Sequence, residues 1–223
     1  KALFSICSEK SPGPDGFSSQ FYKDMWDIVG SDVCAAVKEF FSTGMILKQI
    51  NSTLLTLIPQ IPYPKTVKDF RPIACCNVIF KVISKLICKR LNVVLPEIIS
   101  QNQSASIPGR DIMENILICQ DLIRAYTRKN CTPRLIMKVD LQKAYDTIEW
   151  AFVRDMMCAL NFPIKFTNLV MGCISTTWFT ICINGSNFGF FKGKRGLRQG
   201  DPLSPLIFTI CLEYLSRLLA RIQ

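Results

Sequence analysis

Apolar residues recur along this chain with two periods, and these periods predict helices that alternate with short strands. Helical spacing predicts helices over residues 19–29, 31–42, 77–92, 111–129, 146–160, 163–175 and from 201 past 219. Apolar runs rich in β-forming residues predict strands over residues 53–58, 135–139, 177–183 and 188–191. Asn184-Gly185 stands between the last two strands, and this dipeptide is a strong signal for a two-residue hairpin turn.

The stretch from Leu135 to Glu149 organises the middle of the chain. Residues 135–139 read as a short buried strand that ends at Asp140, and Tyr145 follows five residues later. Asp146 and Glu149 form a capping box that begins the next helix. A carboxylate at a strand end suits a metal ligand that faces a cleft. The alternative is that Asp140 only begins a turn.

The predicted helix over residues 77–92 carries a regular charge pattern. Lys81, Lys85 and Lys89 recur every four residues, opposite a wide apolar stripe. Like charges at this spacing repel one another, so a phosphate backbone is a candidate for the partner that neutralises them. An ordinary solvated helix face is the alternative.

The overall charge favours a polyanionic partner. The chain has 27 Lys and Arg against 17 Asp and Glu, a formal net charge of +10. This balance points to nucleic acid ahead of an acidic membrane surface. No apolar run is expected to span a membrane, and no targeting signal is recognised.

Cysteine and histidine usage excludes several kinds of site. The eleven cysteines contain no C-x-x-C pair and the chain has no histidine, which excludes zinc-finger spacing and Ser/His or Cys/His catalysis. Reduced cysteines that fill the core of an intracellular protein are expected. Any metal must be held by oxygen ligands, which favours Mg²⁺ or Mn²⁺.

Three loops rich in proline or glycine complete the pattern. They are the runs Ser11–Phe17, Phe70-Arg-Pro-Ile73 and Gly196–Pro205. Pro72 holds the backbone of Arg71 extended, so the arginine is presented from a stiff loop; a plain solvated arginine is the alternative. The two glycines of the third loop let the backbone approach a ligand closely, and Asp201-Pro202 suits the start of a helix.

These motifs, in this order, resemble the reverse transcriptase domain of a non-LTR (LINE-type) retrotransposon in its plant-like form. The motifs are Pro12-Gly-Pro-Asp-Gly16, Phe70-Arg-Pro-Ile73, Gln103-Ser with Pro108-Gly-Arg110, Asp140-x-x-Lys-Ala-Tyr-Asp146 and Gly196-Leu-Arg-Gln-Gly-Asp-Pro-Leu-Ser-Pro205. The resemblance covers essentially the whole chain. Its details fit an intron-encoded reverse transcriptase less well.

The resemblance implies an RNA-directed DNA polymerase that works by two-metal nucleotidyl transfer. Asp140 matches a catalytic metal aspartate, with the backbone carbonyl of Leu141 as a second ligand. The implied nucleotide-binding residues are Arg71, Ala144, Tyr145, Gln199 and Gly200, of which Tyr145 excludes a ribose 2′-OH. The implied nucleic-acid contacts are Lys81, Lys85, Lys89, Arg110 and Arg198. Asp146 is read as a helix cap, not as a metal ligand.

The chain departs from the family pattern at two positions and lacks two of the family's parts. Gln60 stands where the family has a lysine, and Ser106 stands where it has an aromatic residue. The family's Asp-Asp hairpin is missing, because no Asp-Asp pair occurs in the sequence, and so is the thumb. One aspartate and one carbonyl are too few ligands for two metal ions. The chain alone is therefore expected not to polymerise, and Mg²⁺ or Mn²⁺ is expected only in the complete domain.

The expected architecture is α+β: the fingers and most of the palm of a right-hand polymerase, truncated before the Asp-Asp hairpin and thumb. Residues 1–130 are expected to form the fingers and the fingers–palm helices, and residues 131–223 an incomplete palm. The Asp140 strand and the hairpin at Asn184-Gly185 are expected to share a small antiparallel sheet packed on helices. A non-catalytic nucleic-acid-binding remnant and a decayed retroelement copy are the alternatives.

The resemblance also implies partners and a location. The implied partners are an RNA template, a DNA primer, deoxynucleoside triphosphates, and the endonuclease and thumb regions of the same polyprotein. No membrane partner is expected. The implied location is intracellular, and nuclear at the site of action.

Overall fold

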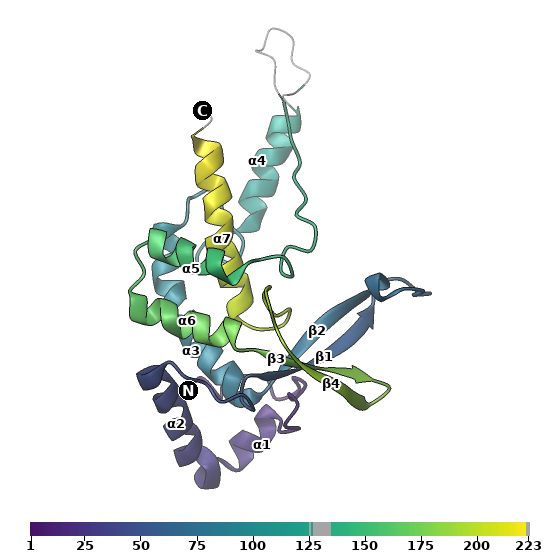
Figure 1. Cartoon of the computed structure of the whole chain (residues 1–223). Coiled ribbons are helices and arrows are strands. Elements are labelled where there is room, and N and C mark those ends of the chain that lie inside the picture. The colour runs from purple at the N-terminus through teal and green to yellow at the C-terminus, as the bar shows by residue number, and fades with distance from the viewer. Residues whose placement is uncertain (125, 127–134, 222–223) are drawn as a thin grey trace.

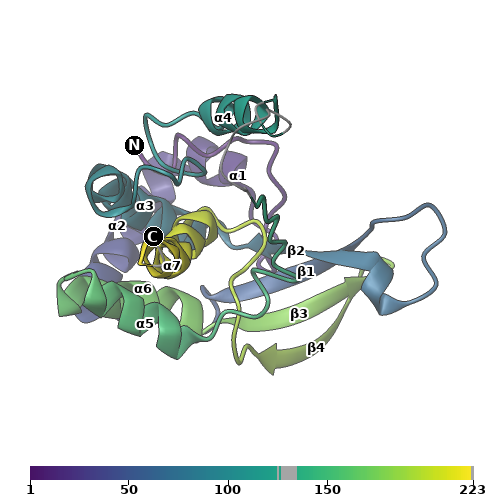
Figure 2. The same cartoon turned by 90° about the horizontal axis from the view of Figure 1, so that it is seen from above.

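A computed structural model describes residues 1–124, 126 and 135–221, and it shows a helical body from which an arm of four strands extends (Figure 1). The helices are α1 (Ser19–Asp24), α2 (Trp26–Thr43), α3 (Val78–Ile98), α4 (Ile112–Arg124), α5 (Trp150–Ala159), α6 (Ile164–Ser175) and α7 (Leu203–Ala220). The strands are β1 (Ser52–Pro59), β2 (Phe70–Cys76), β3 (Trp178–Ile183) and β4 (Ser186–Lys192), with a short 3-10 helix, η1 (Val67–Asp69), before β2. Seen from above, the helices gather on one side and the arm leaves on the other (Figure 2).

The sheet of the arm is mixed. Its strand order is β2-β1-β3-β4, and two antiparallel hairpins meet along a parallel pair of β1 and β3. The expectation of an antiparallel sheet is therefore wrong at its centre. Both central strands leave the helical body at the same place, where the amide of Trp178 donates a hydrogen bond to the carbonyl of Asn51 at 3.3 Å. Strands that start together run in the same direction, and a long helical connection joins them.

The strand expected over residues 135–139 does not form, and its place in the sheet was predicted wrongly. These residues have no regular structure, and the side chains of Leu135 and Met137 are 83% and 74% exposed. A strand needs a neighbour to satisfy its backbone groups. The described sheet contains only β1 to β4, which lie on the other side of the cleft described below. The apolar pattern predicted an extended segment but could not show whether a partner strand lay beside it.

Helix boundaries differ from the expected ones at three places. Helix α3 runs to Ile98, with Pro96 inside it, instead of ending near residue 92. The break between α1 and α2 falls at Met25 instead of Gly30, because the ring of Trp26 packs against Gly30 inside a continuous helix. Helix α5 begins at Trp150, and Glu149 is its N-cap residue without a side-chain cap. The capping box that was expected to start at Asp146 is therefore wrong. The expected end of α4 at residue 129 and the expected domain division at residue 130 lie outside the described residues.

The main core lies between α3, α5, α6 and α7. Its largest fully buried side chains come from all of these helices except α6 and include Phe80, Ile87, Leu91, Met157, Leu203 and Ile207. A smaller cluster packs α1, α2 and the N-terminal segment against the first turns of α3. Helix α3 is thus covered on both sides, which explains the wide apolar stripe in its sequence.

Helix α7 is long and apolar enough, by length and composition, to cross a membrane, contrary to the expectation that no run reaches this length. In the structure it is a core helix. Leu203, Ile207 and Ile210 on it are fully buried, and so is the carboxylate of Glu213, which is paired with Arg217. This packing accounts for the apolar composition of the helix.

The described cysteines are all free thiols, and Cys76, Cys88, Cys173 and Cys211 are buried. Burial raises the pKa of Cys88 and of Cys211 to about 12, so both thiols stay protonated at neutral pH. These four fill the core as expected. Cys7, Cys34, Cys119 and Cys158 are exposed, so the expectation holds for only part of the set.

Candidate functional site

A cleft of about 640 Å³ opens where the arm meets the helical body. Besides Lys10 of the N-terminal segment, three segments far apart in the sequence line it: β2, the segment before α5, and the loop that leads into α7. They contribute Arg71, then Leu141, Lys143, Ala144 and Tyr145, then Gln199 and Gly200. Every residue expected to bind the nucleotide therefore lies at this one cleft.

The loop before α7 is held against the edge of the sheet. The amide of Ala74 on β2 donates a hydrogen bond to the carbonyl of Gln199 at 2.7 Å. Gly200 has φ +113°, and a Cβ there would lie 2.9 Å from the carbonyl oxygen of Ala74. Only glycine fits this close approach without displacing the backbone. The loop therefore lies directly against β2 and holds Gln199 near Arg71.

Tyr145 forms one wall of the cleft. Its ring stacks on Phe208 of α7 with centroids 5.1 Å apart, and its carbonyl accepts a hydrogen bond from the amide of Leu197 at 2.7 Å. Burial raises the pKa of its hydroxyl, which keeps the group neutral at physiological pH. A rigid aromatic wall of this kind can exclude a bulky group from the cleft by its shape.

The cleft carries unpaired positive charge. Lys10, Arg71 and Lys143 line it, and Lys68 and Gln60 join Arg71 and Lys143 around an adjoining space of about 450 Å³. None of these cations is in an ion pair among the described residues. Asp146, an exposed carboxylate, lines the same adjoining space. The arrangement suits an anionic ligand with several charges, such as a triphosphate.

Lys10, Lys68 and Lys143 were not singled out from the sequence. Lys143 stands inside the motif Asp140–Asp146, in the left-handed conformation with φ 51°, at a turn that the amide of Asp146 closes onto its carbonyl at 2.9 Å. Its place in the motif was a signal that could have identified it. Lys10 and Lys68 carried no such signal, because only the fold brings the N-terminal segment and η1 to the cleft.

Asp140 is exposed and directly precedes Leu141, which lines the cleft. No group of three or more Cys, Asp or Glu residues that could hold a metal ion is found in the part of the chain that the structure describes. Asp201 also lines the cleft, but its carboxylate is 3% exposed and is paired with Arg198. Asp140 and the Leu141 carbonyl fit one ligand position each, and they do not make up the ligand set of two metal ions.

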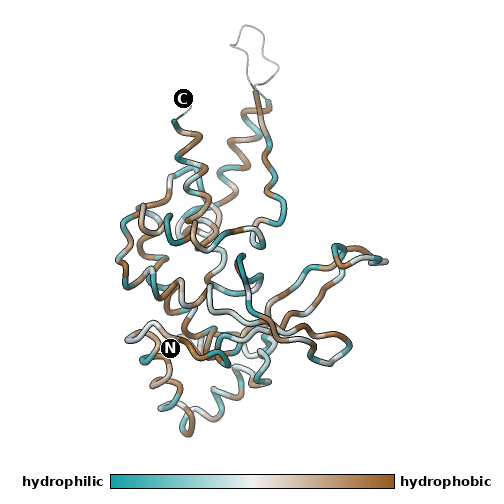
Figure 3. Tube along the Cα trace, in the orientation of Figure 1, coloured by the Kyte–Doolittle hydropathy of each residue, from teal (hydrophilic) through white to brown (hydrophobic). Residues whose placement is uncertain are grey.

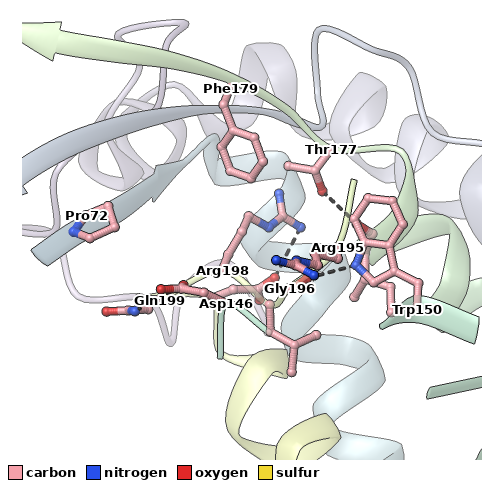
Figure 4. Close-up of a pocket in the computed structure, with 12 residues that line it drawn as sticks. Pro72, Asp146, Trp150, Thr177, Phe179, Arg195, Gly196, Arg198 and Gln199 are labelled. Atoms are coloured by element: carbon pink, nitrogen blue, oxygen red, sulfur yellow. Dashed lines mark hydrogen bonds and ion pairs between the residues drawn. The ribbon is translucent and has the colours of Figure 1, made fainter. Parts of the chain in front are cut away.

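A smaller cavity of about 130 Å³ lies behind Gln199, between the loop and the root of the arm (Figure 4). Trp150 closes one side, and its indole N–H donates a hydrogen bond to the carbonyl of Gly196 at 2.8 Å. The side-chain amide of Gln199 reaches Asp146 Oδ1 at 3.4 Å. This cavity wall joins the start of α5 to the loop that carries Gln199.

Arg198 was expected to contact nucleic acid, and this expectation is wrong. Its side chain is only 4% exposed and forms an ion pair with Asp201 at 3.2 Å. It donates hydrogen bonds to Asn51 Oδ1 at 2.8 Å, to Thr53 Oγ1 at 3.1 Å and to the carbonyl of Cys173 at 3.1 Å, and its guanidinium lies over the ring of Phe80 at 3.8 Å. Arg198 is therefore a buried brace for the loop that presents Gln199 and Gly200.

Arg110 is also occupied within the chain. Its two terminal nitrogens donate hydrogen bonds to four backbone carbonyls at 2.6 to 2.8 Å, those of Pro96, Ile99, Ser100 and Gln103. A guanidinium suits this role because helix ends leave carbonyls without partners. The expected nucleic-acid contact is not supported, and Arg110 instead closes the end of α3.

The lysine stripe of α3 does not face solvent as a unit. Lys81 is 9% exposed and donates to the carbonyl of Ser11 at 2.7 Å, and Lys85 donates to the carbonyl of Ser5 at 2.6 Å. Burial lowers the pKa of Lys81. The expectation that the stripe contacts nucleic acid is wrong for Lys81, because the N-terminal segment buries it. Lys85 is half-exposed, so its contact with nucleic acid stays a prediction. Lys89 is exposed.

Comparison with known proteins agrees with the sequence motifs. The model of the family described as reverse transcriptase (RNA-dependent DNA polymerase) matches residues 63–223. The transposon TX1 uncharacterized 149 kDa protein of Xenopus laevis is 28% identical over 213 residues, which are 96% of this chain and 16% of that protein. The Pol polyprotein of the R2DM retrotransposable element of Drosophila melanogaster is 26% identical over 214 residues, which are 96% of this chain and 20% of that protein. This chain thus spans a fifth or less of the length of these two relatives.

Solved structures show a similar fold. Telomerase from Candida tropicalis, in complex with a fragment of telomeric RNA, aligns with 92% of this chain and 37% of its own at a TM-score of 0.51 and 12% identity. An apo form of that telomerase aligns with 96% of this chain and 48% of its own at a TM-score of 0.50 and 14% identity. The likeness confirms the expected α+β polymerase fold class.

Proposed function

The chain belongs to the reverse transcriptase (RNA-dependent DNA polymerase) family, and on this premise we propose that it forms the nucleotide-binding part of an RNA-templated DNA polymerase of a non-LTR retrotransposon. The observation that carries the proposal is the convergence of Arg71, Tyr145 and Gln199 on one cleft from three distant segments. A cationic end suits a triphosphate, an aromatic wall can select a sugar by its shape, and a close backbone loop can lie against a base; this cleft combines all three.

The residues of the cleft have distinct tasks in the proposal. Arg71 and Lys143 bind the triphosphate, because both are cationic and neither is in an ion pair among the described residues. The ring of Tyr145, held by Phe208, excludes the 2′-OH of a ribonucleotide. Gln199 and Gly200 lie against the incoming base pair, at a distance from the sheet that Arg198 and Ala74 set.

Bound Mg²⁺ or Mn²⁺ would stabilise the attacking and leaving oxygens of the phosphoryl transfer. In the proposal Asp140 and the Leu141 carbonyl supply ligands to it, and further carboxylates come from an Asp-Asp pair that these 223 residues do not contain. The chain by itself therefore binds the nucleotide and does not join it to a primer. An RNA template, a DNA primer and the endonuclease and thumb regions of the same polyprotein are the partners, and the nucleus is the location.

The experiment is a primer-extension assay on a longer chain that carries an Asp-Asp hairpin and thumb after residue 223. Asp140→Asn should abolish synthesis while primer–template affinity stays nearly unchanged, because the amide has almost the same size but is a poorer metal ligand. Asp155→Asn, at an exposed carboxylate on α5, is the matched control and should keep full activity. A fully active Asp140→Asn chain, or DNA synthesis by the 223 residues alone, would contradict the proposal.

A further inference from the structure

The arm carries an excess of positive charge, and part of it lies outside the cleft. Residues 52–76 and 178–195 contain six basic residues and one acidic residue, Asp69. The carboxylate of Asp69 accepts hydrogen bonds from the amides of Lys65 and Thr66 at 2.8 and 2.7 Å, so it is already occupied. The β3–β4 hairpin has no acidic residue at all. This part of the protein is therefore suited to an anionic partner.

The same hairpin exposes aromatic rings. In Figure 3 hydrophobic stretches run along the arm, away from the helical body. Trp178 of β3 and Phe190 of β4 stack with centroids 5.0 Å apart and planes within 15°, and Phe190 is 50% exposed. Lys48, from the turn before β1, places its ammonium 3.7 Å from the Trp178 ring centroid and 4.4 Å from that of Phe190. Lys192 pairs with Trp178 in the strand register and so lies on the same face.

These four residues, Lys48, Trp178, Phe190 and Lys192, form what we call the hairpin patch. The patch faces away from the site described above. Phe179 follows Trp178 in β3 and lines the small cavity behind Gln199. Because neighbouring residues of a strand point to opposite faces of the sheet, Trp178 points to the other face. The hairpin patch is therefore a surface separate from the cleft.

We propose that the hairpin patch binds single-stranded nucleic acid. A half-exposed ring beside a stacked partner offers a platform for an unpaired base, and Lys48 and Lys192 place two cations on the same face of the hairpin for the phosphates of the strand. A duplex keeps its base faces stacked inside, so it cannot use such a platform. A second copy of the chain pairing along the edge of β4 is disfavoured, since two basic arms repel each other. Binding here goes beyond the proposed polymerase function and requires no catalysis.

The test measures binding of a labelled 12-nucleotide single strand and of the matching duplex by fluorescence anisotropy, on the 223-residue chain. Phe190→Leu keeps an apolar side chain but removes the ring, and it should weaken single-strand binding about tenfold. Phe188→Leu is the matched control. Phe188 is on the same strand, is 53% exposed, and pairs with Ile181, which lies on the face of Phe179. This control should leave the affinity unchanged.

A second arm tests the charges without touching a ring. Lys48→Gln with Lys192→Gln should lower the slope of log affinity against log salt by about 1.4, since each single-strand phosphate contact contributes about 0.7. Lys38→Gln with Lys165→Gln removes two exposed lysines from α2 and α6 and controls for net charge. Arg71→Gln should weaken triphosphate binding in the cleft. In that variant Phe190→Leu should still lower the affinity for the single strand by the same factor, which separates this proposal from the polymerase one.

Three results would overturn the proposal. One is equal loss of single-strand affinity in Phe188→Leu and Phe190→Leu. Another is duplex binding that is as tight as single-strand binding and as sensitive to Phe190→Leu. The third is a dimer of the unmodified chain that dissociates in Phe190→Leu, which would assign the edge of β4 to a protein interface. Far-UV circular dichroism of each variant confirms that it is folded.

Discussion

At the scale of single residues, Arg198 is the clearest case of a residue whose role differs from the one that its motif predicts. It supports the fold instead of contacting nucleic acid. It stands beside Gln199 in a loop that lines the cleft, yet its guanidinium points into the core and has five partners there. A buried cation is tolerated only when its charge and its N–H groups are matched. Arg198 therefore supports the cleft from behind.

Replacing Arg198 should destabilise the fold. Arg198→Met leaves the carboxylate of Asp201 buried without its cation, and we expect a loss of about 3–5 kcal/mol in the free energy of unfolding, measured in urea. Arg195→Met is the control, because its ion pair with Glu149 is 59% and 61% exposed at the two side chains and should contribute under about 1 kcal/mol. Equal losses in the two variants would assign Arg198 to the surface.

Tyr145 carries the second residue-scale prediction, which rests on the proposed function. In a longer chain that polymerises, Tyr145→Ala should admit ribonucleotides with little loss of deoxynucleotide use, measured as the ratio of kcat/KM for the two. Tyr145→Phe keeps the ring that stacks on Phe208 and should keep discrimination. Unchanged discrimination in Tyr145→Ala would make Tyr145 a core aromatic only.

At the scale of elements, Glu213 ties α7 to the end of α3. Its carboxylate accepts hydrogen bonds from the amide and hydroxyl of Ser100 at 3.0 and 2.6 Å and pairs with Arg217 at 2.7 Å. Burial acts to raise the pKa of Glu213, but the hydrogen bonds from Arg217 and Ser100 outweigh it and hold this pKa below the usual value of 4.5. The ionised carboxylate thus joins two helices that are remote in the sequence.

This carboxylate should make stability depend on pH in the acid range. A lowered pKa in the folded state stabilises the fold above the unfolded pKa, and this contribution is lost as the pH falls through the folded value. Glu213→Gln should cost about 1–3 kcal/mol at pH 7 and flatten the decline in stability below about pH 4.5. Glu97→Gln, at an exposed carboxylate on α3, should leave both unchanged. The measurement is a series of urea titrations from pH 3 to 7. If the free energy of unfolding falls with pH in parallel in the unmodified chain and in Glu213→Gln, the expectation is contradicted.

The sequence predicted elements best where local signals were sufficient. The strands near residues 53–58 and 177–183 and the turn at Asn184-Gly185 were found, because β-formers and turn residues act locally. Residues 135–139 were predicted to form a strand but have no regular structure, because strand formation depends on a neighbouring strand that a local pattern cannot show. The lysines of α3 were misread for a related reason. Periodicity gave their common face but not the N-terminal segment, which buries Lys81 and accepts a hydrogen bond from Lys85.

The candidate site was predicted well for its lining and poorly for its supports. Motif matching placed Arg71, Tyr145 and Gln199 at one cleft, and the structure brings them together. It also assigned Arg110 and Arg198 to nucleic acid, although both are bound to groups inside the chain. The identity of a charged residue in a motif does not show whether its side chain points to a ligand or into the core. Only the packing around it decides between the two.

At the scale of the whole molecule, one side of the helical body exposes a large apolar surface. All described residues of α4 are exposed, and so are Leu135, Met137 and Val139 of the segment that runs back from it (Figure 1). Monomeric proteins rarely expose apolar patches of this extent. The surface should be a source of self-association for the 223-residue chain in isolation.

We expect the isolated chain to bind the dye ANS and to form larger species as its concentration rises, measured by light scattering. Leu135→Glu with Met137→Lys should reduce both effects with little change in melting temperature, because these side chains are 83% and 74% exposed and support no core. Exposed Ile28→Glu with Met45→Lys, on and after α2, is the charge-matched control. A strictly monomeric chain without dye binding would contradict this expectation.

The parallel pairing of β1 with β3 has a consequence for how the protein is made. On a ribosome, α2, β1, β2 and α3 emerge early, and the β1–β2 hairpin can close as soon as it is free. The edge of β1 that receives β3 stays uncovered until Trp178 and the residues after it have been synthesised. Pairings between distant parts of a chain form slowly, and open strand edges attract other chains meanwhile. The nascent arm is therefore the stage at which we expect the growing polypeptide to be most open to pairing with other chains.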